Sequence, residues 1–218
     1  EYALNMSYSR DIDTLFSVGG TLKTIYSLFE TYWSIGNTVD IAGTYYNSKQ
    51  LFTAAVVVKN LGYQWKPYVK GSVREPMPFE VQLGISKKVQ KAPFRLGLIL
   101  THLEKWDLTF VDPVLAQQSV DPITGEAIKT SKFRTFFDKL GRHVIFNTEI
   151  LLTKNFNIRL GYNYQRRAEL KVEARPGIAG FSFGAGMKIY KFHLSYGYAK
   201  YHLAGTSNHI TISTNLSD

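Results

Sequence analysis

The sequence predicts an all-β fold and, more specifically, a transmembrane antiparallel β-barrel. Two observations carry this prediction: apolar and polar residues alternate in eleven strand-length segments, and the connections between these segments alternate in length. A third observation is that no run of about 18 apolar residues occurs, so no transmembrane helix is predicted and any membrane crossing is expected to use strands. The chain has 218 residues, and we expect one outer-membrane barrel domain over residues 1–218.

The clearest pair of segments is Phe181–Ile189 and Phe192–Tyr198. In both, aromatic or aliphatic residues alternate with small or polar ones. Because successive side chains of a strand point to opposite faces, each segment presents one apolar and one polar face. A two-residue turn between them pairs Ile189 with Phe192, which keeps the apolar rows on the same side. Lipid-facing strands of about 9–11 residues with a polar inner side have this pattern.

The other segments repeat the same period of two along the chain. In Phe79–Ile85, for example, four apolar residues alternate with Glu80, Gln82 and Gly84. A short helix is expected over Phe133–Leu140. The predicted strands, in chain order, are Tyr2–Tyr8, Phe16–Tyr26, Val39–Tyr45, Phe52–Val58, Phe79–Ile85, Phe94–Leu100, Val144–Leu152, Phe156–Tyr164, Phe181–Ile189, Phe192–Tyr198 and Ile210–Leu216.

The predicted connections alternate between short and long. The short ones are Ser9–Thr14, Asn47–Gln50, Lys87–Pro93, Thr153–Asn155 and Tyr190–Lys191; the long ones are Phe29–Ser34 (a short helix or an ordered loop), Asn60–Met77, Leu103–Arg142, Arg166–Gly177 and Ala204–Ser207. Outer-membrane barrels have short periplasmic turns and long surface loops. With this orientation the first segment starts at the outer surface, whereas single-chain bacterial barrels have even strand numbers and periplasmic termini. An odd number of further strands is therefore expected ahead of Glu1, and the printed chain is expected to be a fragment.

The net charge of +9 does not indicate a nucleic-acid partner, because the basic residues are scattered over turns and loops. Basic side chains at strand ends favour anionic lipid headgroups or lipopolysaccharide instead. The chain has no cysteine, so it holds no disulfide and no thiolate metal site.

The sequence predicts no catalytic, cofactor or metal site. His193 and Ser195 share the polar row of their strand, where small and polar residues are expected for structural reasons. His143 and Glu149 are expected to point the same way, with Arg159 or Arg95 as partners. Neither a His-x-x-x-His pair nor a calcium-loop spacing of carboxylates occurs. We therefore predict a protein without enzymatic activity.

The polar rows together carry charges of both signs. Such a mixture predicts an interior that is plugged or cross-linked by ion pairs, rather than an ion filter of one sign. The charged residues expected on this face are Asp40, Glu80, Arg95, Glu149, Arg159 and Lys188.

Six short motifs stand out along the chain: Gly19–Lys23, Tyr45-Tyr46, Val58–Gly62, Pro78–Gly84, His102-Leu103 with Trp106–Leu108, and Tyr201 with Ala204-Gly205 and Asn208–Thr211. Together and in this order, these motifs resemble the PorQ family of outer-membrane proteins of the type IX secretion system. That family and its relative PorV form a group similar to the fourteen-stranded FadL-type transporters.

The resemblance implies a multi-pass barrel in the outer membrane that takes part in a surface attachment complex. Its implied partners are a PorZ-like surface protein, with PorU and PorV, and lipopolysaccharide, and the chemistry belongs to the sortase PorU. Fourteen strands less the eleven predicted leaves three, an odd number. The implied partner surface consists of the long loops Asn60–Met77, Leu103–Arg142 and Arg166–Gly177.

Two alternatives remain open. A FadL-like transporter of hydrophobic compounds predicts an apolar pocket inside the barrel and a lateral opening or strand kink. A soluble β-sandwich adhesin predicts that Phe181, Phe183, Leu194 and Tyr196 are buried in a closed core, with Lys188 and His193 in water.

Overall fold

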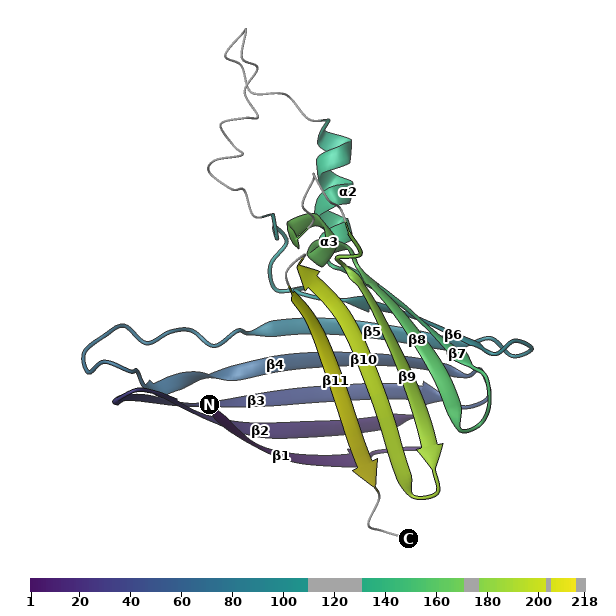
Figure 1. Ribbon diagram of the computed structural model, residues 1–218, viewed down its shortest axis with the longest axis horizontal. Coiled ribbons are helices and arrows are strands. Elements are labelled where there is room, and N and C mark those ends of the chain that lie inside the picture. The colour runs from purple at the N-terminus through teal and green to yellow at the C-terminus, as the bar shows by residue number, and fades with distance from the viewer. Residues whose placement is uncertain (110–130, 171–176, 203–204, 215–218) are drawn as a thin grey trace, which may run out of the picture. The chain divides into compact units, whose positions relative to one another are not determined.

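Eleven antiparallel strands and two helices make up the part of the chain that the structure describes (Figure 1). This structure is a computed structural model, and it describes residues 1–109, 131–170, 177–202 and 205–214. The chain divides into two units, residues 1–104 and 105–218. The predicted all-β class and the eleven predicted strands are confirmed, whereas the single barrel domain stays a prediction.

The first unit is an antiparallel meander in which each strand pairs with the strands before and after it. In Figure 1 these strands lie side by side in chain order. The strands are β1 (Tyr2–Asp11), β2 (Phe16–Phe29), β3 (Tyr32–Asn47), β4 (Phe52–Lys66), β5 (Glu80–Lys88) and β6 (Phe94–Leu100).

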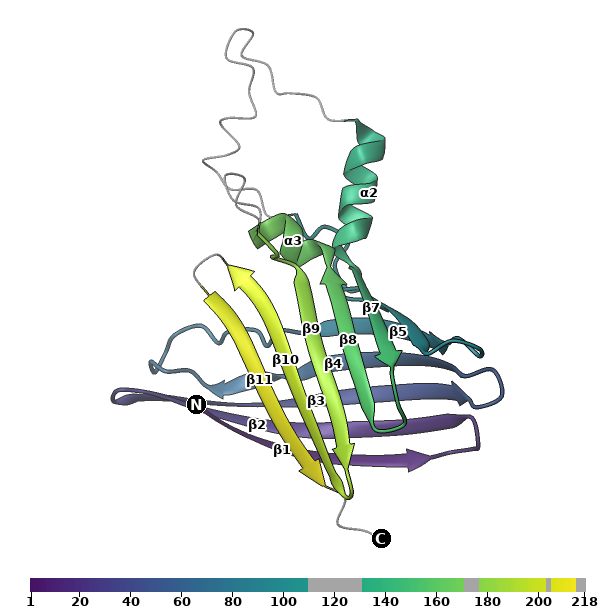
Figure 2. The same cartoon turned by 45° about the vertical axis from the view of Figure 1, so that its right-hand side comes forward.

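The second unit is a five-stranded meander with two helices at one end of its strands (Figure 2). The short turns before Phe156 and Phe192 lie at the other end. The elements are α2 (Lys132–Arg142), β7 (Val144–Leu151), β8 (Phe156–Asn163), α3 (Tyr164–Leu170), β9 (Phe181–Ile189), β10 (Phe192–His202) and β11 (Gly205–Thr214). No helix among the described residues is long and apolar enough to cross a membrane.

The predicted hairpin has the predicted register, because Phe192 pairs with Ile189. The predicted helix over 133–140 is confirmed as α2.

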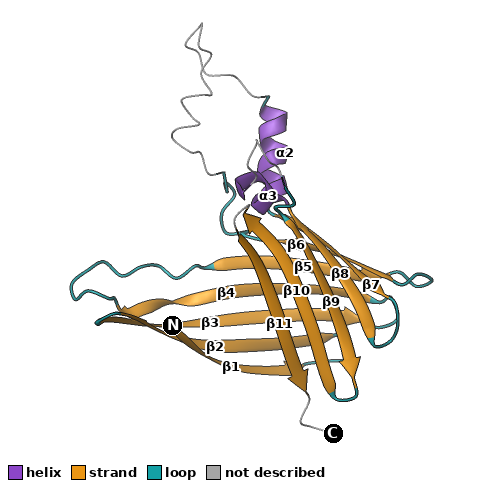
Figure 3. Ribbon diagram, in the orientation of Figure 1, coloured by secondary structure: helices purple, strands orange, loops and turns teal. Residues whose placement is uncertain are grey.

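The alternation of short and long connections is wrong at Phe29–Ser34. There β2 and β3 are joined by Glu30 and Thr31 alone, and Phe29 pairs with Tyr32 (Figure 3). Glu30 adopts a positive φ of 52° in this tight turn. Glutamate seldom adopts such a φ, so the sequence did not indicate a tight turn at this position.

Asn60–Met77 was predicted as one loop, but its first seven residues continue β4 to Lys66. Asn60 has a φ of 58° and lies where the pairing of β3 with β4 shifts between Val39 and Ile41. It therefore forms a bulge inside the strand, not a turn that ends it.

Two further loop predictions are corrected in the second unit. The first residues of Arg166–Gly177 belong to α3, because the Asn163 side chain accepts the backbone N–H of Arg166 at 2.9 Å and caps the first turn. Gly205–Ser207 is strand, since it pairs with β10. The predicted loop centre Asp112–Thr130, residues 171–176, Ala204 and Leu216 lie outside the described residues.

Neither unit buries its apolar rows as a soluble sheet does, and in the first unit the buried side chains are polar. Among the described residues the only buried apolar side chain is Ala179, while the buried polar residues are Ser27, Ser34, Thr38, Gln64, Thr101 and His143. On β9 and β10, Phe181, Phe183, Leu194 and Tyr196 are all exposed. Lys188 and His193 on the opposite row are exposed too, as the soluble alternative predicted, and Gly186 of that row is buried. A closed apolar core around these four side chains, as a soluble sandwich requires, is absent from the described residues.

Aromatic side chains cluster near both ends of the apolar face of the first unit. At one end the Tyr26 ring lies 5.9 Å from Trp33, and at the other the Phe16 ring lies 5.1 Å from Tyr45. Phe16 and Tyr26 are ten residues apart on β2, which corresponds to about 33 Å along a strand. At a tilt of about 40° this length spans about 25 Å, the height of the apolar band in outer-membrane barrels.

The close approach of β3 to Gly62 on β4 leads to a testable prediction about the pairing of these strands. A Cβ at this position would lie 2.0 Å from the carbonyl oxygen of Asn37 and 2.7 Å from Cα of Thr38, and backbone atoms cannot move away freely. Gly62→Ala is therefore expected to cost about 1–3 kcal/mol in the free energy of unfolding, as overpacking does. The matched control is Gly43→Ala on β3, which has open space around its Cβ. Equal stability of the two variants in a denaturant titration would contradict this pairing.

Candidate functional site

The helix α2 carries an apolar stripe that nothing in the described chain covers. Phe133, Phe136, Phe137 and Leu140 follow the spacing i, i+3, i+4, i+7, which places them on one helical face. All four are exposed, and no residue of α2 is buried. An isolated helix of this length is marginal in water, so its stability must come from the contacts at its base.

The aromatic residues of the stripe contact one another and Trp106. The rings of Phe133 and Phe137 lie 4.5 Å apart, and Phe136 lies 5.7 Å from Trp106. Trp106 in turn stacks on His143 at 5.7 Å, and His143 Nε2 lies 3.1 Å from the Trp106 carbonyl oxygen. Since a carbonyl only accepts, Nε2 of His143 carries the proton. The stripe and Trp106 form one aromatic surface, which we call the α2 surface.

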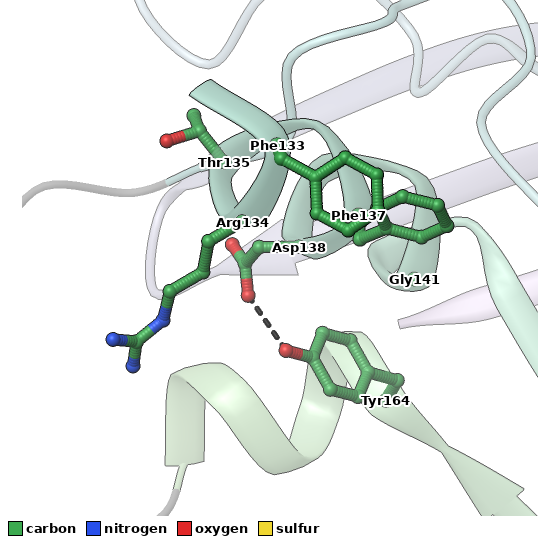
Figure 4. A pocket seen from close by; sticks show the side chains of 7 residues that line it. All are labelled: Phe133, Arg134, Thr135, Phe137, Asp138, Gly141 and Tyr164. Atoms are coloured by element: carbon green, nitrogen blue, oxygen red, sulfur yellow. Dashed lines mark hydrogen bonds between the residues drawn. The ribbon is translucent and has the colours of Figure 1, made fainter. Parts of the chain in front are cut away.

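Ion pairs and hydrogen bonds fix the base of α2. The Tyr164 hydroxyl of α3 donates to Asp138 at 2.7 Å, and Arg142 Nε donates to the same carboxylate at 2.9 Å (Figure 4). Lys139 donates to Asp107 at 2.6 Å, and Arg142 also lies 3.7 Å from Glu169. These contacts hold the part of α2 from Asp138 to Arg142, whereas the first half of the helix extends beyond them.

A hollow of about 740 Å³ lies between α2 and α3. Figure 4 shows Phe133 and Phe137 on one side of it and Tyr164 on the other. Its lining residues are Phe133, Arg134, Thr135, Phe137, Asp138, Gly141 and Tyr164. The hollow gives this part of the α2 surface a concave wall to which Phe133, Phe137 and Tyr164 contribute aromatic rings.

The contact between α2 and α3 is expected to depend on pH at both ends of the scale. Burial acts to raise the pKa of Asp138, but the bonds from Tyr164 and Arg142 outweigh it and hold the pKa below the ordinary 3.8. This stabilisation is present above pH 3.8 and is lost as the pH falls through the lowered pKa. The bond to Asp138, with burial, raises the pKa of Tyr164 above 10.0, so its stabilisation is present below pH 10 and lost as the pH rises further.

Hydrogen exchange of the α2 amides measures this dependence. After correction for the intrinsic rate, protection is expected to fall about fivefold at either limit, as for a bond worth about 1 kcal/mol. The Tyr164→Phe variant should lose the alkaline limit and keep the acid one that Arg142 provides. Protection that stays flat in the wild type as the pH falls through the titration of Asp138 and rises through that of Tyr164 would contradict this role of Asp138.

A second group of polar residues crosses the polar face of the first unit. Lys23 Nζ lies 2.5 Å from Asp40 and donates to Asn60 Oδ1 at 3.2 Å, and Asp40 accepts the backbone N–H of Asn60 at 2.9 Å. The Asn60 side chain also donates to the carbonyl of Pro78 at 2.8 Å. The bulge in β4 thus joins β2, β3 and the start of β5, and we call this group the Lys23 network.

Further along the same unit, Glu80 lies 3.9 Å from Lys59 and 3.8 Å from His102. His102 also contacts Glu104 at 3.1 Å, and Glu104 accepts the backbone N–H of Val81 at 2.8 Å. Acidic and basic side chains are paired here, as predicted for Asp40 and Glu80.

In the second unit the predicted pair of Glu149 with Arg159 is confirmed at 3.2 Å. The prediction that His143 shares the face of Glu149 is wrong: His143 ends α2 and stacks on Trp106. His193 is exposed and pairs across the hairpin with Lys188, and Ser195 pairs with Gly186. Among the described residues, no group of three or more His, Asp or Glu side chains could hold a metal ion.

The predicted partner surface Leu103–Arg142 contains α2, but within it only a short helix was predicted and not the apolar stripe. The spacing of Phe133, Phe136, Phe137 and Leu140 is the signal that could have found it. What the spacing could not show is that no described element covers this stripe.

No family model and no curated protein matches this chain.

Proposed function

We propose that this chain forms part of a β-barrel in the outer membrane and anchors a protein at the cell surface. In its finer form, the proposal is a FadL-like barrel of fourteen strands that resembles the PorQ family. Its role is non-enzymatic: it holds a PorZ-like protein, together with PorU and PorV, in a type IX attachment complex. Lipopolysaccharide and membrane lipid are its other contacts, and nucleic acid is not a partner.

The single observation that carries the proposal is the exposure of the apolar rows in both units. Large apolar rows that remain exposed cost free energy in water, at about 25 cal/mol for each Å². The same rows are favourable against lipid, where backbone groups must be hydrogen-bonded, and the inner strands of each unit are paired on both sides. A monomeric soluble protein rarely exposes apolar surface on this scale.

The two aromatic clusters support the same environment. Rings near Tyr26 and Trp33 at one end, and near Phe16 and Tyr45 at the other, are separated by about the height of the apolar band. Lys66 lies over the Trp33 ring at 3.0 Å, a position from which an ammonium group reaches the headgroup layer.

The paired charges on the polar face favour an anchor over an open channel. The Lys23 network and the Glu149–Arg159 pair tie neighbouring strands together and leave mixed charge along this face. In a barrel this arrangement stiffens the wall, and it provides no path of one sign for ions.

The position of the helices supports a partner on one side only. In the second unit, α2 and α3 lie at the strand ends opposite the turns at 152–155 and 190–191. In the first unit the connection 67–79 is likewise longer than the turns 48–51 and 89–93 at the opposite strand ends. The two-residue turn at 30–31 is the exception on this side; longer connections on one side are the surface loops of an outer-membrane barrel.

Removal of the protein from its native cell tests this function. The proposal expects the loss of one surface protein and of attached cargo, while uptake of fatty acids stays unchanged. An unchanged set of surface proteins would contradict it.

A transporter of hydrophobic compounds is the second candidate, and one observation favours it. An apolar hollow of about 600 Å³ in the first unit is lined by Ser27, Leu28, Phe29, Tyr32, Tyr68, Val69 and Glu1. Saturable binding of a fluorescent fatty acid that is lost in Leu28→Arg would favour this candidate over the anchor.

A further inference from the structure

We propose that α2 is the docking element for a surface protein that presents an apolar groove rimmed by acidic side chains. This inference rests on the proposed function and names the element and the chemistry of its partner. Phe133 and Phe137 are the anchors that fill the groove, and Lys132 and Arg134 meet its rim.

The apolar part of the argument is the exposed stripe. Phe133 is 72% exposed, and the Phe136 and Phe137 rings meet edge to face at 5.6 Å, so the aromatic side chains form one patch. An amphipathic helix with anchors at i, i+3, i+4 and i+7 is the form in which helices enter apolar grooves. Aromatic side chains of this kind supply most of the binding energy at protein interfaces.

The charged part of the argument is the composition of α2. It holds four basic residues, Lys132, Arg134, Lys139 and Arg142, and one acidic residue, Asp138. Lys139 and Arg142 are paired at the base, whereas Lys132 and Arg134 have no ion pair among the described residues. On a helical wheel these two residues flank the stripe on either side, so an acidic rim is complementary to them.

Two other occupants fit the structure less well. A membrane surface binds an amphipathic helix that lies flat in the interface, but α2 runs on from the ends of the strands of its own unit, away from their sheet (Figure 2). A second copy of this chain would bring basic residues against basic residues, whether the two helices paired parallel or antiparallel. Both occupants are outcomes of the test below.

The test begins with the photoreactive residue benzoyl-phenylalanine placed at Phe133, and separately at Phe137, of the intact protein in its native cells. The control position is Tyr190, an exposed side chain in the turn at the opposite strand ends. The proposal expects one protein adduct from both α2 positions and none of that protein from position 190. Adducts with lipid or with a second copy, or no adduct, would overturn it.

The protein found in the adduct is then purified and its affinity measured. Phe133→Ala with Phe137→Ala should weaken binding by about 30-fold or more, since each anchor is worth more than about 1 kcal/mol. Lys132→Glu with Arg134→Glu should weaken it about tenfold and remove most of its salt dependence. Tyr190→Ala, an aromatic truncation in the turn at the opposite strand ends, is the matched control and should bind as the wild type does; unchanged affinity in both double variants would also overturn the proposal.

Carbonate extraction and gel mobility, measured on the same membranes, distinguish a failure of docking from a failure of the proposed function. A protein that resists carbonate extraction and shows a heat-dependent mobility on gels, yet gives no adduct, contradicts the docking role of α2 alone. A protein that carbonate extracts contradicts the membrane anchor itself.

Discussion

Leu22→Arg is expected to destabilise the protein by about 2–4 kcal/mol when it is folded in lipid bilayers, the cost measured for arginine at the bilayer midplane on the outside of a barrel. Leu22 lies in the apolar row of β2, between the aromatic clusters, and its side chain is 45% exposed. It pairs with Met6 on one side and with Val39 on the other, both of which are also exposed.

The same substitution distinguishes a lipid-facing row from an exposed row of a soluble protein. In a soluble protein an exposed side chain tolerates arginine within about 0.5 kcal/mol. The matched control is Val73→Arg, because Val73 is 90% exposed in the connection between β4 and β5 and should tolerate the charge. Denaturant titration of the intact protein in bilayers measures both variants, and equal stability of the two would count against a lipid-facing row.

Asp40→Leu is the second substitution with a large expected effect, a loss of about 2–3 kcal/mol. It removes the carboxylate that lies 2.5 Å from Lys23 and that accepts the Asn60 backbone N–H. Both side chains of the pair are mostly buried, so Lys23 would keep a sheltered and unpaired charge. Breaking a fully buried pair costs about 3–5 kcal/mol, and the remaining solvent contact lowers this figure.

A double variant isolates the effect of the unpaired Lys23 charge on stability. Lys23→Met with Asp40→Leu leaves no uncompensated ion and should be more stable than Asp40→Leu alone. Glu149→Gln is the comparison, because its partner Arg159 is 56% exposed and the loss should stay below about 1 kcal/mol. If the double variant is no more stable than the single one, Lys23 does not depend on Asp40.

Strand positions were predictable from the sequence because the period of two is set by the side chains themselves. The pairing of Ile189 with Phe192 followed from turn length alone. Strand ends were less predictable: Glu30 adopts a positive φ that is uncommon for glutamate, and the positive φ of Asn60 belongs to a bulge where its residue type suggests a turn equally well. Asn60 in particular resembles a turn residue but is held inside the sheet by Asp40 and Lys23.

The candidate site was predictable only in part. Opposite charges at Glu149 and Arg159 indicated their pair, because both lie on the polar row of adjacent strands. His143 was assigned to the same row, but the α2 helix continues to Arg142 and turns this residue toward Trp106. The α2 surface depends on contacts between Asp138, Tyr164 and Arg142 that no spacing in the sequence shows.

Spin labels placed one at a time along β2 test the central claim most directly. The chain has no native cysteine, so single cysteines at successive positions from Ser17 to Thr24 can each carry a label in the intact protein in bilayers. The account predicts a period of two: labels at Val18 and Leu22 collide with oxygen dissolved in the lipid, and labels at Thr21 and Lys23 do not. Labels at Val18 and Leu22 that collide instead with a water-soluble nickel complex would show that this row faces water, and they would contradict the account.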